Sequence, residues 1–224
     1  MADYFAAFLD LRGRRCLVVG GGAIGECKAR ELLECGALVS VVSPTLTPGL
    51  DDLAAAGRLS RRARRFRRGD ARGCAVVIAA TGDCRVDEAV AAQARRCHAL
   101  VNVVDAPAHC DFIVPSVLRR GPLQIAVSTG GRSPALARDI RRRLEPLFGA
   151  DLGEVVEEVG HGRAQARARA STPEARRLAG ERAAARALGA IIPSREMLVP
   201  ERGVMRHYAQ AVTESSLSRA KEER

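Results

Sequence analysis

The chain has 224 residues, of which 47% are hydrophobic, so it is long enough for one full core and a smaller second unit. No segment approaches the about 18 uninterrupted apolar residues that cross a bilayer, and the N-terminus mixes acidic with apolar residues, unlike an export signal. We therefore expect a cytoplasmic protein with no membrane partner.

The formal net charge of +10 comes almost entirely from arginine. Charge alone is compatible with nucleic acid, an acidic membrane or an anionic small molecule as partner. The chain has no Trp, two Tyr and five Phe, so it lacks the stacking surfaces that single-strand binders use. We expect no nucleic-acid partner.

Seven cysteines are scattered along the chain and none forms a C-x-x-C pair. An odd, scattered set indicates neither a disulfide framework nor a zinc knuckle. We expect reduced thiols, most of them buried.

The first hundred residues alternate strand and helix patterns. Buried-strand patterns cover residues 15–20, 37–43, 74–81 and 99–105. Helical spacing covers 26–36, which ends at a glycine suited to a helix C-cap, and 85–97. This alternation predicts parallel pairing with right-handed crossovers, hence an α/β fold with a Rossmann-like, doubly wound sheet.

A glycine motif stands between the first strand and the first helix. Gly20, Gly22 and Gly25 match G-x-G-x-x-G in the order strand, turn, helix. The first glycine permits the turn, the second lets the backbone approach a pyrophosphate, and the third lets the helix pack on the strand. The motif predicts binding of a dinucleotide such as NAD.

The acidic residue that usually binds the ribose is absent from the end of the second strand, which reads "VVSP". Ser43 and Pro44 stand there, and the Ser43 hydroxyl could bind the ribose more weakly than a carboxylate. Arginines that could accept the 2′-phosphate of NADP follow at Arg61, Arg62, Arg64, Arg65, Arg67 and Arg68. Because few apolar residues interrupt them, the segment 58–70 is more typical of a solvated edge strand, so the choice between NAD and NADP stays open.

Three stretches together resemble one known family. They are "FLDLRGRRCLVVGGGAIGECKARELLECGALVSVVSP", "VVIAATGD" and "LVNVVDAPAHCDFIVPSVLRRGPLQIAVSTGGRSPALARDIRRRLE". Over about residues 5–146 the chain resembles the precorrin-2 dehydrogenase family, which oxidises precorrin-2 to sirohydrochlorin in siroheme synthesis; some members also insert the iron. The resemblance implies an NAD-binding Rossmann domain (1–113), a small α+β dimerisation domain (114–147), a helical C-terminal domain (148–224) and a homodimer.

Asp105 is the candidate catalytic residue. It ends the strand pattern "LVNVVD", and ligands of open α/β sheets bind at the carboxyl ends of strands. The oxidation removes a hydride and a proton, so it needs a base, and in similar enzymes the aspartate of this motif is the proposed general base. The alternative is an aspartate that caps the turn before Pro107. A non-catalytic NAD sensor or scaffold on the same fold would need the glycine turn but no such carboxylate.

The resemblance also implies the remaining cofactor contacts. They are Gly20, Gly22, Ala23, Ile24, Gly25, Ser43, Pro44, Thr81, Gly82, Asp83 and Val104. His109 and Asp111 are secondary candidates. His109 could relay protons or meet incoming iron, but its position is more typical of a loop residue outside the site. Asp111 could start the next strand or cap a turn, and no metal ligand is assigned. The sequence leaves open whether the protein inserts a metal.

The segment 127–145 is expected to contact the carboxylates of precorrin-2. Ser133 and Pro134 open a helix, and the loop before it includes Ser128, Thr129 and Gly130, whose backbone N–H groups would suit a carboxylate. The candidate arginines are Arg119, Arg120, Arg132 and Arg138; the alternative is that they are ordinary surface arginines.

Beyond Glu145 the chain is rich in alanine and arginine. Helical spacing interrupted at Gly160, Gly162, Pro173 and Gly189 predicts short helices in a small bundle, then a fraying tail at 213–224.

Overall fold

The computed structural model describes residues 4–170 and 172–191 of the chain. Its contacts divide the chain into two units, one formed by Met1–Ser116 and Ala126–Ile140, the other by Val117–Ile125 and Arg141–Arg224. The expected tail at 213–224 and the end of the expected domain 148–224 lie outside the described residues. The expected domain 114–147 is shared between the two units, so the three-domain division stays a prediction.

The first unit contains a five-stranded parallel sheet, as the alternating patterns predict. Its strands are β1 (Arg15–Val19), β2 (Leu38–Val42), β3 (Ser60–Arg62), β4 (Val76–Ala79) and β5 (Leu100–Val103), in the order β3-β2-β1-β4-β5. The chain runs outward from β1 to β2 and β3, then returns to the other side of β1 for β4 and β5. The order therefore reverses between β1 and β4, which is where such sheets bind ligands, at the carboxyl ends of the strands.

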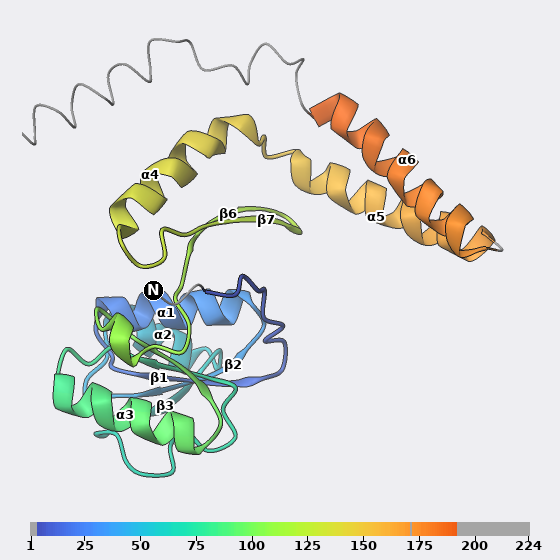
Figure 1. The fold of residues 1–224 in the computed structure, drawn as a ribbon. Helices are drawn as coiled ribbons and strands as arrows, with labels where there is room; N and C mark the ends of the chain where they lie inside the picture. Colours follow the sequence, from blue (N-terminus) through green and yellow to red (C-terminus); the bar gives the residue numbers. More distant parts are fainter. Residues whose placement is uncertain (1–3, 171, 192–224) are drawn as a thin grey trace, which may run out of the picture. The chain divides into compact units, whose positions relative to one another are not determined.

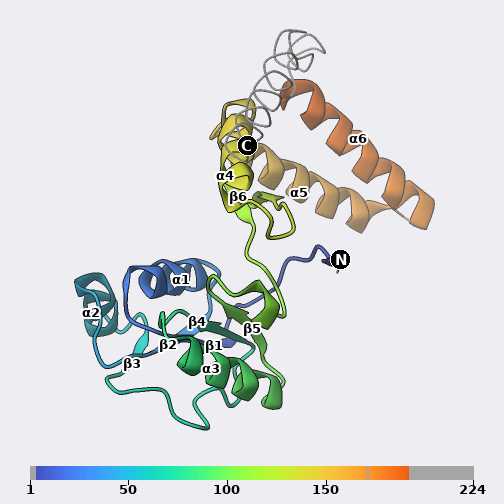
Figure 2. The same ribbon diagram turned by 60° about the vertical axis from the view of Figure 1, so that its left-hand side comes forward.

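Helices cover both faces of the sheet. In Figure 1, α1 (Ala23–Glu34) and α2 (Pro48–Ala55) lie on one face and α3 (Cys84–Arg96) on the other, and Figure 2 shows the same arrangement. Alternate residues of β1 enter the two cores: Val18 packs on the α1 side and Leu17 on the α3 side, both fully buried. Burial on both faces explains why these strands read as continuous apolar runs in the sequence.

The ends of α1 differ in how well the sequence predicts them. The C-terminal end is as expected, because Gly36 takes the left-handed conformation (φ +72°) just past the C-cap Cys35. The helix begins at Ala23, three residues before the predicted start, because the glycine turn leads straight into it. The sequence did not predict α2, a helix of eight residues that Thr47 caps by accepting a hydrogen bond from the backbone N–H of Leu50.

The arginine-rich segment forms the edge of the sheet, as predicted, through β3. Arg61 pairs with Asp51 of α2 (2.7 Å). Arg62 and Arg64 both donate to the carboxylate of Asp70 (2.7–2.8 Å), which also accepts the backbone N–H of Arg67 (2.8 Å). The side chain of Asp70 is 5% exposed, so these contacts are shielded from water.

The Asp70 contacts predict a pH dependence of stability. The Arg64 guanidinium, more than any other group, lowers the pKa of Asp70 from 3.8 to about 2. A depressed folded-state pKa contributes stability above the unfolded pKa, here about 2 kcal/mol, which is lost as the pH falls from about 5 through 2. We expect the free energy of unfolding of Asp70→Asn to be lower at neutral pH and to fall less steeply in acid, as measured by urea unfolding between pH 7 and pH 2. Parallel curves for the two proteins would contradict this.

The remaining elements include a small hairpin sheet and three further α-helices. β6 (Ser116–Arg120) and β7 (Leu123–Val127) form a two-stranded sheet, and α4 (Pro134–Leu144) begins at the predicted proline. Two single-turn 3₁₀ helices occur at Pro107–His109 (η1) and Glu145–Leu147 (η2).

The C-terminal helices are longer than predicted. α5 (Leu152–Arg169) contains Gly160 and Gly162 without interruption, and only the break before Pro173 separates it from α6 (Pro173–Ile191). The prediction of short helices was wrong, because a glycine inside a helix costs only about 1 kcal/mol relative to alanine and contacts between helices offset it. α5 and α6 lie side by side (Figures 1 and 2). Within the described residues, no helix has the length and apolar character needed to cross a membrane.

Candidate cofactor and active site

Four glycines lie at the junction of β1 and α1, three in the turn and Gly25 in the first turn of the helix, and packing requires three of the four. Gly20 has φ +115°, and a Cβ there would collide with the carbonyl oxygen of Ala80. A Cβ on Gly25 would collide with the carbonyl oxygen of Gly20, so the helix can approach the strand only without one. Gly21, to which the sequence assigned no role, packs just as closely against the carbonyl oxygen of Thr45.

The remaining glycine of this junction, Gly22, faces open space. Around the Cβ position of Gly22 there is no atom within 4 Å, although Gly22 is the N-cap of α1 and has no side-chain cap. The first N–H groups of a helix lack partners inside it, and the helix dipole favours an anion there. The open space and the free donors therefore fit the pyrophosphate of a dinucleotide.

The sheet brings the predicted cofactor residues to one edge. Ala23 and Ile24 open α1, Ser43 and Pro44 follow β2, Thr81, Gly82 and Asp83 follow β4, and Val104 and Asp105 follow β5. Two of these side chains also have structural roles. The hydroxyl of Thr81 donates to Asp87 (2.7 Å), and Asp83 caps α3 by accepting from the N–H groups of Arg85 and Val86. Their contacts with a cofactor stay predictions.

Asp105 lines a cavity that reaches the first turn of α1. The cavity has a volume of about 350 Å³, and its wall includes Ile24 from the first turn of α1, Gly82 after β4, and Val104 and Asp105 after β5. Asp105 stands two residues beyond the end of β5 in the left-handed region, with φ +58°. A carboxylate is thus placed on the wall of the same cavity as the start of α1.

The carboxylate of Asp105 does not cap the turn that follows it. That turn, η1, has Ala106 at its N-cap and no side-chain cap. Cys110 stabilises this loop. Its thiol lies 3.2 Å from both the backbone nitrogen and the carbonyl oxygen of Val103, and 3.4 Å from the carbonyl oxygen of Ala106. Asp105 therefore does not cap η1, and the alternative that it caps the turn before Pro107 stays a prediction.

Asp111 fixes the far end of the same loop. Its carboxylate accepts from the N–H of Val101 (3.0 Å) and from Nε of Arg95 (2.9 Å). Asp111 thus closes the outer edge of β5. No signal in the sequence distinguished this role from the expected turn cap, because the contacts join residues that are ten and sixteen positions apart.

His109 lies closer to the site than its position in a loop suggested. It lines the cavity of Asp105 together with Cys84 and Glu88, and its Nε2 is 4.0 Å from Oε1 of Glu88. Among the residues that the structure describes, no group of three or more His, Cys, Asp or Glu side chains is arranged to hold a metal ion.

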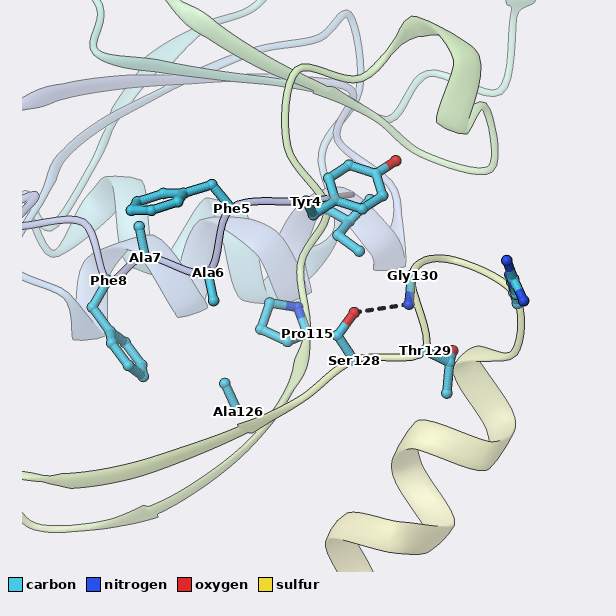
Figure 3. Close-up of a pocket in the computed structure, with 12 residues that line it drawn as sticks. Tyr4, Phe5, Ala6, Ala7, Phe8, Pro115, Ala126, Ser128, Thr129 and Gly130 are labelled. Atoms are coloured by element: carbon cyan, nitrogen blue, oxygen red, sulfur yellow. Dashed lines mark hydrogen bonds between the residues drawn. The ribbon is translucent and has the colours of Figure 1, made fainter. Parts of the chain in front are cut away.

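A second cavity of the first unit, of about 570 Å³, lies between the N-terminal segment and the loop after β7 (Figure 3). Tyr4, Phe5 and Phe8 line it; Phe5 is 93% exposed and Phe8 69%. On the other side are the predicted substrate residues Ser128, Thr129, Gly130 and Arg132. The sequence did not assign the aromatic residues a role, although three of them within five positions were a visible signal.

The loop before α4 uses part of its own hydrogen-bonding capacity. The N–H of Gly130 donates to Oγ of Ser128 (3.1 Å), and the N–H of Ser133 donates to Oγ1 of Thr129 (3.0 Å). The N–H of Gly130 is therefore already used within the loop, which makes it a weaker candidate for binding a carboxylate of the substrate.

The four candidate arginines are divided between the two units. Arg132 and the exposed Arg138 belong to the first, whereas Arg119 and Arg120 belong to the second. Arg120 donates from Nε to the carbonyl oxygen of Phe148 (2.8 Å) and so braces the chain before α5. Its role in substrate binding, like that of the other three, stays a prediction.

Two family models match the chain. Residues 7–116 match a family described as "Putative NAD(P)-binding", and residues 120–146 match "Sirohaem biosynthesis protein central". A solved structure of the precorrin-2 dehydrogenase SirC superimposes over 94% of this chain and all of that one, with a TM-score of 0.66 and 25% identity. The chain thus combines an NAD(P)-binding segment with the central segment of sirohaem biosynthesis proteins. Its first domain is accordingly an NAD(P)-binding domain, and the glycine turn, Ser43 and Asp105 all lie within that match.

The curated relatives of the chain are longer proteins. The siroheme synthase of Nitrosomonas eutropha is 43% identical over 181 residues, which are 80% of this chain and 38% of that protein. The siroheme synthase of Methylobacillus flagellatus is 45% identical over 171 residues, 76% of this chain and 37% of that one. The chain thus spans less than two fifths of the length of these relatives.

Proposed function

We propose that this protein oxidises precorrin-2 to sirohydrochlorin with NAD⁺, as a step of siroheme biosynthesis. The observation that carries the proposal is that Asp105 and Ile24 line the same cavity, so a cofactor held at the start of α1 brings its reactive end near one carboxylate. The names of the similar proteins, siroheme synthase and precorrin-2 dehydrogenase, support this choice of substrate.

Different residues of the chain bind the cofactor and transfer the proton. Bound NAD⁺ supplies the acceptor for the hydride that leaves precorrin-2. The N–H groups at the start of α1 hold the pyrophosphate, and Ser43 lies at the strand end where the adenosine ribose binds. Asp105 takes the proton that the substrate loses with the hydride, and His109, on the wall of the same cavity, passes it to solvent.

The reaction can be tested directly. Purified protein mixed anaerobically with precorrin-2 and NAD⁺, with metal ions removed, is expected to form NADH and the absorption spectrum of sirohydrochlorin in equal amounts. Without NAD⁺ neither product is expected. Tight binding of NAD⁺ with no turnover would instead favour the sensor or scaffold.

Metal insertion into sirohydrochlorin is a second candidate activity. It is favoured by the oxygen donor of Asp105 and the nitrogen donor of His109 in one cavity. Faster formation of siroheme from Fe²⁺ and sirohydrochlorin with the protein than without it, in the absence of NAD⁺, would support this lyase activity. Equal rates would exclude it.

We also propose that the protein acts as a cytoplasmic homodimer. α4 buries only Ala137, whereas its Leu136 and Ile140 are 41% and 37% exposed, and a two-stranded sheet such as β6–β7 is marginally stable alone. A second copy would cover these apolar residues, and sedimentation at micromolar concentration would then give twice the mass of the chain. All seven cysteines are free, which fits a reducing compartment.

A further inference from the structure

The cavity that Asp105 lines is acidic, although the chain as a whole has a formal net charge of +10. Its wall includes the carboxylates of Asp87, Glu88 and Asp105, and none of the described residues that line it is Lys or Arg. In the proposed function this cavity holds the nicotinamide ring, which is positively charged in NAD⁺ and neutral in NADH. The charge of the wall therefore acts differently on the two forms of the cofactor.

The three carboxylates differ in their access to water. Asp105 is exposed, and the side chain of Glu88 is 61% exposed, so water and salt screen both charges. Asp87 is only 6% exposed. Because a buried charge is screened much less, Asp87 is expected to have the largest electrostatic effect on a ligand in this cavity.

The local structure explains why a buried carboxylate is tolerated here. Asp87 lies in the first turn of α3, where the helix dipole favours a negative charge. Its Oδ1 accepts from the backbone N–H (3.3 Å) and from the hydroxyl (2.7 Å) of Thr81, in the loop after β4. These two hydrogen bonds hold the side chain of Asp87 in one orientation.

The second oxygen of this carboxylate has no partner within the part of the chain that the structure describes. Oδ2 of Asp87 accepts no hydrogen bond there, because both donors of Thr81 contact Oδ1. Oδ2 is not sealed inside the protein, since the only fully buried side-chain nitrogen or oxygen atom without a partner among the described residues is Oε1 of Gln93. An uncompensated charge in a buried place is costly, and a positive charge in the cavity would compensate it.

We propose that Asp87 makes this cavity select the oxidised cofactor over the reduced one. Its buried carboxylate stabilises the positive charge of the nicotinamide ring of NAD⁺ and has no such interaction with the neutral ring of NADH. The protein therefore binds NAD⁺ more tightly than NADH, which favours release of NADH after hydride transfer. This inference rests on the cofactor site of the proposed function and adds to it a residue that determines specificity.

The test is the ratio of the dissociation constant of NADH to that of NAD⁺, measured by titration calorimetry on the full chain. Wild-type protein is expected to bind NAD⁺ more tightly. Asp87→Asn keeps an oxygen that can accept from Thr81, so it is expected to fold, and it is expected to lower the ratio about tenfold by weakening the binding of NAD⁺ alone. Tenfold corresponds to about 1.4 kcal/mol, less than the attraction of two opposite charges a few ångströms apart near a protein surface.

The neighbouring Glu88 provides a matched control. Glu88→Gln removes the same charge from the next position of α3 and from the wall of the same cavity. Because water screens that charge, the ratio is expected to stay within about twofold of the wild-type value. An equal shift in both variants would overturn the inference, since it would assign the effect to the overall charge of the cavity rather than to Asp87.

Tighter binding of NADH than of NAD⁺ to the wild-type protein would also overturn the inference, and this measurement needs no variant. Equal weakening of both cofactors in Asp87→Asn would do the same, because it is the result expected if Asp87 only supports the loop of Thr81. Each of these results leaves the binding of NAD⁺ and the oxidation of precorrin-2 by the wild-type protein intact. Failure of the wild-type protein to bind either cofactor would instead contradict the proposed function itself.

Discussion

Asp105→Asn is expected to lower the rate of precorrin-2 oxidation by about 10²–10⁴-fold, the usual contribution of a general base. The amide cannot accept the proton that leaves with the hydride. Asparagine tolerates the left-handed backbone that Asp105 adopts (φ +58°), so the loop between β5 and η1 is expected to keep its shape. The loss therefore reports on proton transfer rather than on folding.

The measurement is the rate of NADH formation in single turnovers, together with the dissociation constant of NAD⁺. The affinity for NAD⁺ is expected to stay within about twofold, because the backbone N–H groups at the start of α1, and not the side chain of Asp105, hold the pyrophosphate. Asp52→Asn, an exposed aspartate on α2, is the matched control and is expected to turn over like the wild type. Undiminished turnover in Asp105→Asn would remove this residue from the mechanism.

The second large effect separates two glycines of the same turn. Gly20→Ala is expected to lower the free energy of unfolding by more than about 2 kcal/mol, because the new Cβ collides with the carbonyl oxygen of Ala80 and φ +115° is unfavourable for alanine. Gly22→Ala is expected to change stability by less than about 0.5 kcal/mol, since its backbone is extended and no atom lies near the new methyl group. That methyl group would occupy the space of the pyrophosphate and weaken NAD⁺ binding about tenfold or more.

Urea unfolding and NAD⁺ titration of the two variants check this contrast. The expected pattern is a destabilised Gly20→Ala and a stable Gly22→Ala that has lost cofactor affinity. A Gly22→Ala protein with wild-type affinity would show that the pyrophosphate binds elsewhere. A fully stable Gly20→Ala would show that β1 and β4 can move apart at the turn.

The sequence predicted the parallel sheet and the glycine turn because their signals are local. Buried parallel strands read as short apolar runs, and the turn needs glycine at positions set by the backbone itself. The edge strand was predicted from its charge. The ends of elements were less accurate, as α1 shows, because the periodicity of the helix begins only after the turn that starts it.

Parts of the site depend on contacts between distant positions and could not be predicted in this way. The thiol of Cys110 supports the loop of Asp105 through three backbone groups, yet its sequence neighbours suggest only a buried cysteine. The pairing of Arg62 and Arg64 with Asp70 joins residues eight and six positions apart across the bend that follows β3. From the sequence alone, these arginines are typical of a solvated surface.

The most direct test is a crystal structure of the protein with NAD⁺ bound. The pyrophosphate is expected on the N–H groups of Ala23, Ile24 and Gly25, with the nicotinamide ring in the cavity and the carboxylate of Asp105 turned toward it. An empty turn at residues 20–25, or a carboxylate that faces away from the ring, would contradict the assignment of this cavity as the active site.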